Sequence, residues 1–206
     1  MKTKPIVLIS MIFLALYSEK GLAQELELST GITHKFLMGK QKDFYSPALG
    51  IELAAGRQEL TPFSADMVTW GLNVGIFRMN RISAGEEDST GQYQQLITTK
   101  GTYRYDYYYN DFFSFFYGAD AGFQFITPKS EQPMTVPVNH GTRIFTRAVV
   151  APNVGVNFEF NPYVAVYYKF QYEVGKYFGE QPLWGSPSSK WNHLLTNAAG
   201  LRIKIY

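Results

Sequence analysis

The chain of 206 residues contains no cysteine, which excludes a disulfide framework and a lipoprotein anchor. Its charges nearly balance, with 19 lysine and arginine residues against 17 aspartate and glutamate residues. The basic footprint of a nucleic-acid-binding protein is therefore lacking, and we expect no nucleic-acid partner. Beyond residue 23 no apolar run approaches the ~20 residues of a membrane-spanning helix. If the protein lies in a membrane, we expect it to cross as strands.

The one long apolar run lies at the N-terminus. Lys2 and Lys4 precede an apolar stretch over residues 6–17, and small residues follow it. This order is typical of a secretory signal peptide. A membrane anchor is the alternative, although the run is shorter than a spanning helix requires. We predict a signal peptide over residues 1–23 and a single domain over residues 24–206.

Apolar and polar residues alternate with period two in segment after segment of that domain. Such alternation is typical of strands whose two faces meet different surroundings. About eight such segments occur, and most are close to the ~9–11 residues with which a tilted strand crosses a bilayer. They run from Leu26 to Phe36, Leu49 to Ala55, Val68 to Ile76, Tyr93 to Tyr107, Phe113 to Phe125, Asn153 to Phe160, Val164 to Gly175 and Trp191 to Ile205.

The connections between these segments alternate in length. Tight turns are predicted at Asn110-Asp111 and Asn161-Pro162, whereas MGKQKDFYSP, NRISAGEEDSTG, TPKSEQPMTVPVNHGT and GEQPLWGSPSSK are long and polar. Short periplasmic turns and long outer loops are the pattern of bacterial outer-membrane barrels. The stretch RQELTPFSAD is longer than that pattern favours. We predict an all-β fold, an antiparallel up-and-down transmembrane β-barrel of about eight strands.

Alternation alone leaves open which face points outward, since a secreted lipocalin-like barrel keeps its apolar face inside. Two observations favour an apolar exterior. The apolar face carries too many aromatic side chains for the interior of an eight-stranded barrel, and the other face is rich in glycine and small polar residues. The aromatic residues also gather near the strand ends, with aliphatic residues between them, as membrane interfaces favour.

The middle segment YRYDYYYNDFFSFFYGADAGFQF, the turn NPY and the ending AGLRIKIY together resemble the small outer-membrane β-barrel proteins of Gram-negative envelopes. These are the OmpA/OmpX-like and porin-like single-domain barrels. The resemblance implies an outer-membrane location, contact with outer-membrane lipids, and recognition of the last strand by the barrel-insertion machinery. Ile205 stands where that family usually ends on an aromatic residue, and Tyr206 is one residue extra. We expect the last strand to close the barrel against the first.

The inward face is predicted to hold acidic and basic residues in nearly equal number. Because unpaired charge in a narrow lumen is unfavourable, these groups should pair. The interpretation we favour is a plug of ion pairs that stabilises the barrel, and the alternative is a polar path for a small solute or ion. The predicted lumen network consists of Glu52, Lys100, Arg104, Asp120, Lys169, Glu173 and Arg202.

Signals for enzymatic chemistry are weak. Barrel enzymes that modify lipid A place a histidine and a serine at the membrane rim, and His34 and His193 fall near adjacent strand ends, with Ser188 and Ser189 nearby. The deacylase pattern has a serine two residues after the histidine, where this chain has Leu195. His140 completes the histidines, and no zinc-binding spacing occurs among the three. We predict no enzyme activity, cofactor or metal.

We therefore expect a monomeric barrel with a structural or interaction role at the envelope. Exposed loops on a rigid scaffold are where binding usually occurs, so the loops face outside and are candidates for contact with an extracellular ligand or protein. The alternatives are a narrow pore for small solutes or ions and a barrel enzyme that modifies lipid A.

Overall fold

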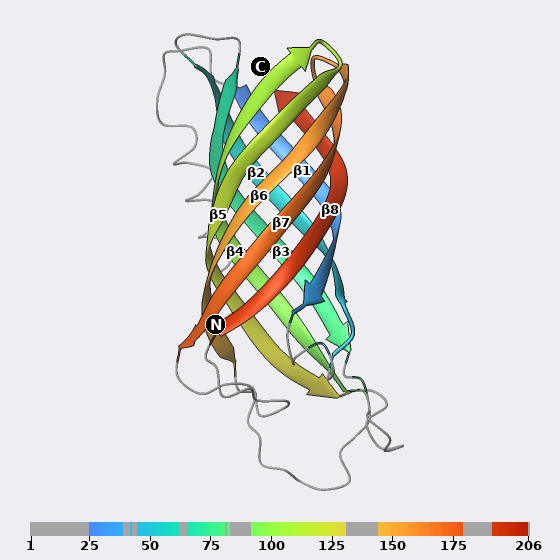
Figure 1. Cartoon of the computed structure of the whole chain (residues 1–206), viewed down its shortest axis with the longest axis vertical. Helices are drawn as coiled ribbons and strands as arrows, with labels where there is room; N and C mark the ends of the chain where they lie inside the picture. The colour runs from blue at the N-terminus through green and yellow to red at the C-terminus, as the bar shows by residue number, and fades with distance from the viewer. Residues whose placement is uncertain are drawn as a thin grey trace, which may run out of the picture.

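The computed structural model describes residues 25–38, 42, 45–61, 66–80, 82, 92–130, 144–178 and 191–205. These residues form a closed antiparallel barrel in which each strand pairs with its neighbours in sequence and β1 pairs with β8 (Figure 1). The predicted all-β up-and-down barrel is confirmed. Its strands are β1 (Glu25–Leu37), β2 (Ala48–Leu60), β3 (Met67–Asn80), β4 (Gln92–Asn110), β5 (Phe113–Ser130), β6 (Phe145–Asn161), β7 (Val164–Phe178) and β8 (Trp191–Ile205).

Alternating polarity determines which side chains point inward. In β3, Asn73 is buried in the lumen. Val74 and Ile76 point to the outer surface, where they are 43% and 54% exposed. Successive strand side chains point to opposite faces, so one register shift would reverse every residue. No helix in the described part of the chain is long and apolar enough to cross a membrane.

The seam between β1 and β8 closes the barrel. Its register runs from Leu26 opposite Ile205 to Leu37 opposite Leu194. The backbone groups of the last strand are thereby paired on both sides, as a strand in lipid requires. The expectation that the last strand pairs with the first is confirmed, while Tyr206 lies outside the described residues.

Asparagine side chains build the two shortest turns. The Asn110 Oδ1 atom accepts a hydrogen bond from the Phe112 N–H at 2.9 Å. The Asn161 Oδ1 atom accepts from the Tyr163 and Val164 N–H groups at 2.8 and 2.9 Å. Asparagine favours such turns because its side chain can satisfy backbone donors two or three residues on. Both predicted turns are confirmed.

The connection between β2 and β3 is shorter than the sequence suggests. Residues 57–60, expected to belong to a long turn, continue β2, with Arg57 opposite Trp70 and Leu60 opposite Met67. Beyond them the Thr61 N–H donates to the Asp66 carbonyl oxygen at 2.9 Å. The charged sequence RQEL resembles a loop by composition, but in β2 Arg57 and Glu59 pair with each other on the outer face, while Gln58 is buried in the lumen.

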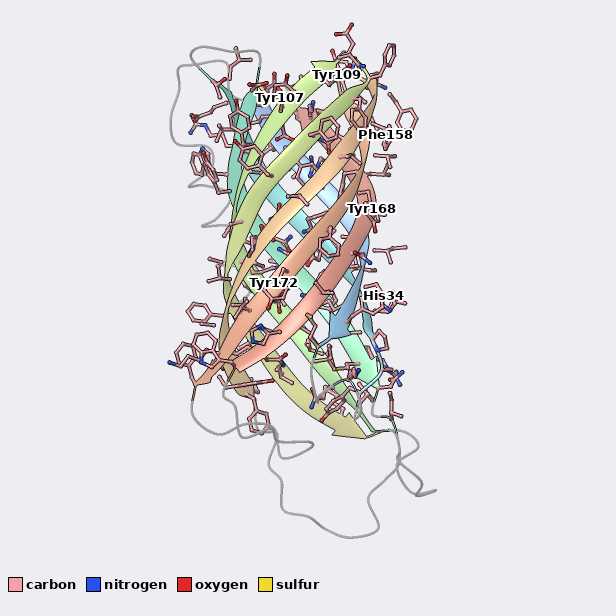
Figure 2. The ribbon with its side chains drawn as sticks, viewed as in Figure 1. His34, Tyr107, Tyr109, Phe158, Tyr168 and Tyr172 are labelled. Atoms are coloured by element: carbon pink, nitrogen blue, oxygen red, sulfur yellow. The ribbon has the colours of Figure 1, made fainter. Side chains whose placement is uncertain are left out.

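The outer surface carries aromatic side chains toward both ends. Figure 2 shows Tyr107, Tyr109 and Phe158 toward the end with the short turns, and Tyr172 and His34 toward the end with the long connections. Aliphatic residues lie between these zones, such as Val74 and Val154 at 43% and 55% exposure. An apolar band flanked by aromatic residues matches the hydrocarbon core and its two interfaces.

Candidate functional site

The lumen holds ion pairs in successive layers along the barrel axis. The layer closest to the long connections is centred on Glu173 of β7. Its carboxylate accepts from the Lys35 Nζ atom at 3.0 Å and from the Arg147 Nη2 atom at 2.6 Å. All three side chains are essentially inaccessible to solvent. One carboxylate on β7 thus balances two cations, which come from β1 and β6.

The middle layer joins two carboxylates to two lysines. Glu52 lies 3.0 Å from the Lys169 Nζ atom and 3.6 Å from the Lys100 Nζ atom. Asp120 lies 3.5 Å from the same Lys100 atom, and it accepts a hydrogen bond from the Gln171 side-chain amide at 2.7 Å. Because Lys100 also approaches Glu173 to 4.0 Å, this layer is electrostatically continuous with the first.

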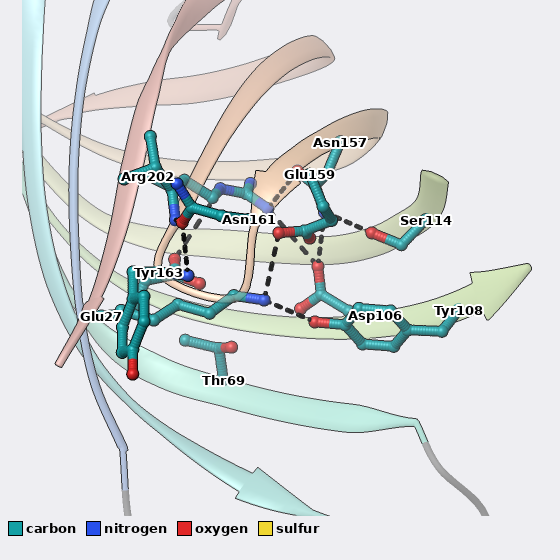
Figure 3. A network of polar contacts seen from close by, with 12 residues as sticks. Glu27, Thr69, Asp106, Tyr108, Ser114, Asn157, Glu159, Asn161, Tyr163 and Arg202 are labelled. Carbon is teal, nitrogen blue, oxygen red and sulfur yellow. Dashed lines mark hydrogen bonds and ion pairs between the residues drawn. The ribbon is translucent and has the colours of Figure 1, made fainter. Parts of the chain in front are cut away.

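The layer toward the short turns is built on two arginines. Arg104 donates to both Glu27 oxygens and, through Nε, to Asp106 at 2.7 Å. Arg202 lies 3.4 Å from Asp106 and donates to Asn157, which in turn donates to Asp106 at 3.0 Å (Figure 3). Such forked arginine contacts fix both geometry and charge.

A last contact lies at the barrel mouth. Lys204 donates to the Tyr108 hydroxyl at 2.9 Å and to Glu159 at 3.3 Å. Beyond it, toward the short turns, opens a vestibule of about 870 Å³ with Phe112 and Phe160 on its walls. The polar layers therefore begin at the floor of this vestibule.

The structure places every residue of the predicted lumen network inside the barrel in ion-pair contact. Glu52, Lys100, Asp120 and Lys169 form the middle layer, Glu173 the first, and Arg104 and Arg202 the third. The sequence reasoning missed Arg147, because the predicted strand began only at Asn153. Extending the period-two alternation back from Asn153 would have placed Arg147 on the inward face.

An apolar cap at the end of the lumen next to the long connections was also not predicted. Phe77 and Leu96 are apolar residues on the otherwise polar inward face, and they are 1% and 2% exposed. Tyr45, from the connection between β1 and β2, packs against them, and its hydroxyl accepts a hydrogen bond from Gln94 at 2.9 Å. The cap consists of Tyr45, Ala48, Phe77, Met79, Leu96, Ile126, Phe145 and Tyr177.

A small polar cavity remains between the middle and third layers. Its volume is about 40 Å³, and Glu52, Asn73 and Arg202 contribute to its wall. Within the described residues, the Glu52 Oε1, Asn73 Oδ1 and Arg202 Nε atoms make no protein hydrogen bond. A water molecule needs roughly 10–15 Å³ of such space, so the cavity suits a few waters that satisfy these atoms.

The two histidines among the described residues have different partners. His34 is opposite Asn197 in the β1–β8 register, and its ring lies 4.2 Å from that of Phe36. The His193 Nδ1 atom is 2.7 Å from the Tyr172 hydroxyl. His140, Ser188 and Ser189 lie outside the described residues.

Comparisons with known proteins find the same architecture. No protein-family model and no curated protein matches the chain. Among solved structures, neisserial surface protein A matches with a TM-score of 0.56 at 11% identity, over 91% of this chain and 100% of that one. Ail, the attachment invasion locus protein of Yersinia pestis, in complex with the heparin analogue sucrose octasulfate, matches with a TM-score of 0.53 at 15% identity, over 89% of this chain and 100% of that one.

A third match is the outer membrane protein OprG of Pseudomonas aeruginosa, with a TM-score of 0.51 at 11% identity, over 89% of this chain and 97% of that one. At such identities the likeness concerns the fold, and the membrane assignment also rests on the apolar outer band. The chain is an eight-stranded β-barrel with the fold of the small outer-membrane barrel proteins, and its location is the outer membrane.

Proposed function

We propose that the protein serves as a non-conducting scaffold in the outer membrane that presents its long loops for binding outside the cell. The observation that carries this proposal is the filled lumen. Buried ion pairs run from Lys204 to Glu173, and the apolar cap over Phe77 follows them. An eight-stranded barrel has room for little besides its own side chains. With the interior occupied, the loops are the part available for a partner.

Conductance in planar lipid bilayers tests the occlusion. We expect the wild-type protein to give no stable channel steps, because an ion would have to displace paired buried charges. A larger porin in the same bilayer provides the positive control. Stable steps whose size changes in Lys100→Met or Asp120→Asn would instead support the narrow-pore alternative.

Shortening the loops tests the binding role. The name of the similar protein Ail, attachment invasion locus protein, suggests attachment, and residues 83–90 carry three carboxylates and no basic residue. Cells that display the protein are therefore compared with cells that lack it for adhesion to surfaces coated with a basic extracellular protein. We expect adhesion by the wild type and its loss when residues 83–90 and 131–143 are each replaced by Asn-Gly, a sequence suited to tight hairpins. Heat-modifiable migration should persist in that variant, which controls for barrel folding. Equal adhesion by both forms would show that the loops do not carry the binding.

We also propose that the barrel is not an enzyme. The observation in favour is that the His193 Nδ1 atom lies 2.7 Å from the Tyr172 hydroxyl, so this ring nitrogen already has a hydrogen-bond partner. Release of acyl chains from lipid A by the purified protein, lost in His193→Ala, would overturn this part of the proposal.

A further inference from the structure

The vestibule beyond Lys204 has the size and much of the lining of a small-molecule site. Its volume of about 870 Å³ lies within the roughly 300–1,000 Å³ of ligand pockets, which are mostly apolar with a few polar groups. Leu60 and Met67, which are opposite each other in the β2–β3 register, form one apolar part of its wall. Phe112 and Phe160 add two aromatic rings next to the short turns. The ion pairs fill the lumen beneath it, so the vestibule is a closed-ended pocket.

Backbone hydrogen bonds hold the rim of the vestibule in place. The Phe112 carbonyl oxygen accepts from the Glu159 N–H at 2.9 Å, which ties the turn between β4 and β5 to β6. The Tyr163 carbonyl oxygen accepts from the Lys204 N–H at 2.8 Å, which ties the turn between β6 and β7 to β8. A rim that is already ordered loses little conformational entropy when a ligand binds.

Negative charge prevails in the vestibule. Its wall carries three acidic residues, Glu25, Asp111 and Glu159, and Lys204 is the one basic residue among the described residues that line it. The Lys204 ammonium is already engaged, because it donates to Glu159 and to the Tyr108 hydroxyl. The Glu25 Oε2 atom is enclosed and makes no hydrogen bond within the described part of the chain. The vestibule therefore favours a cation that can donate hydrogen bonds.

The combination of apolar and acidic walls narrows the kind of cation. In the part of the chain that the structure describes, no group of three or more histidine, cysteine, aspartate or glutamate side chains is placed to hold a metal ion. A hydrated metal ion would also gain nothing from Leu60, Met67 or the aromatic rings. A neutral apolar molecule would leave the Glu25 carboxylate without a partner. An organic cation with an apolar group satisfies both parts of the wall.

We propose that the vestibule binds a small organic cation, a primary ammonium carried on an apolar group. The ammonium lies against the Glu25 carboxylate in the negative field of Asp111, and the apolar group packs against Met67 and the Phe112 ring. Aromatic rings add to the attraction, because a cation is drawn to the face of the ring. Short turns of outer-membrane barrels face the periplasm, so the ligand enters from that side. This site is separate from the long loops and from the scaffold role.

Nuclear magnetic resonance of methionine methyl groups tests the proposal. The protein, labelled with carbon-13 at these methyl groups and reconstituted in phosphatidylcholine nanodiscs, is titrated with phenethylammonium chloride. We expect a saturable shift of the Met67 resonance, which a Met67→Leu variant assigns. The Met79 methyl group lies in the apolar cap at the other end of the lumen and should not respond. Phenethyl alcohol, an uncharged molecule of nearly the same shape, should shift Met67 far less at equal concentration.

Matched variants make the result specific. E25Q/D111N removes two charges with little change of shape and should bind phenethylammonium roughly tenfold more weakly, since a partly exposed ion pair contributes up to about fivefold in affinity. Glu59→Gln removes an exposed carboxylate on the outer face and should bind as the wild type does. Equal affinity of E25Q/D111N and wild type would overturn the proposal. An equal Met67 shift with phenethyl alcohol, or no shift with either compound, would overturn it in the wild-type protein itself, whatever the folding of the variants.

Discussion

Replacing Glu173 with alanine is expected to lower the free energy of unfolding by about 3–5 kcal/mol, the range observed when one member of a buried ion pair is removed. The substitution leaves Lys35 and Arg147 buried side by side with their shared carboxylate removed. Lys100, at 4.0 Å from the same carboxylate, is left with less compensation as well. Urea unfolding in lipid vesicles, followed by tryptophan fluorescence and heat-modifiable migration, measures the effect.

The matched control for this prediction is Glu59→Ala. Glu59 also pairs with an arginine, Arg57 at 3.3 Å, but its side chain is 45% exposed. Exposed ion pairs contribute about 0–1 kcal/mol, so this variant should unfold close to the wild type. Glu173→Gln should fall between them, since it keeps hydrogen-bonding capacity without the charge. If Glu173→Ala unfolds like Glu59→Ala, the buried pairs are not what stabilises the lumen.

Gly200→Val is expected to prevent closure of the barrel, and Gly200→Ala to destabilise it by about 1–3 kcal/mol, as overpacking does. Gly200 is opposite Gly31 at the β1–β8 seam. A Cβ atom on Gly200 would collide with the Thr30 carbonyl oxygen and the Gly31 backbone. Both are main-chain atoms, so the collision is relieved only if the two strands separate.

Gly101→Ala is the control for the seam substitutions. It introduces the same methyl group on β4, where the nearest heavy atom would be 3.8 Å away, an ordinary contact distance. Refolding into detergent micelles is scored by the fraction of protein in the faster-migrating, unheated band. We expect Gly101→Ala to refold like the wild type and Gly200→Val to give little of that band. Normal refolding of Gly200→Val would show that the seam tolerates a wider separation of β1 and β8.

Much of this architecture could be predicted from the sequence because a barrel strand has two unlike faces. The stretch from Phe113 to Phe125 alternates at every position except the inward-facing Phe116, and it forms the core of β5. Inward charges such as Lys100 and Asp120 could be identified because alternation alone assigns them to the lumen. The prediction was weakest at strand ends, where RQEL was read as a turn although it continues β2.

Two features of the lumen could not be derived in this way. The cap involves pairs such as Ile76-Phe77 and Leu96-Ile97, in which neighbouring residues are both apolar, so alternation does not show which one points inward. The choice of ion-pair partners depends on the register of all the strands. Lys35 and Glu173 are 138 residues apart in sequence, and no local pattern reports such a contact.

The cross-lumen ion pairs have a consequence for assembly of the barrel. Lys35 on β1 contacts Glu173 on β7, Lys169 on β7 contacts Glu52 on β2, and Arg104 on β4 contacts Glu27 on β1. None of these three ion pairs joins two strands that are neighbours in the sheet. The pairs therefore form only when the growing sheet curves round, and until then their charges stay hydrated. We therefore expect dehydration of the interior to accompany the joining of the first strand to the last.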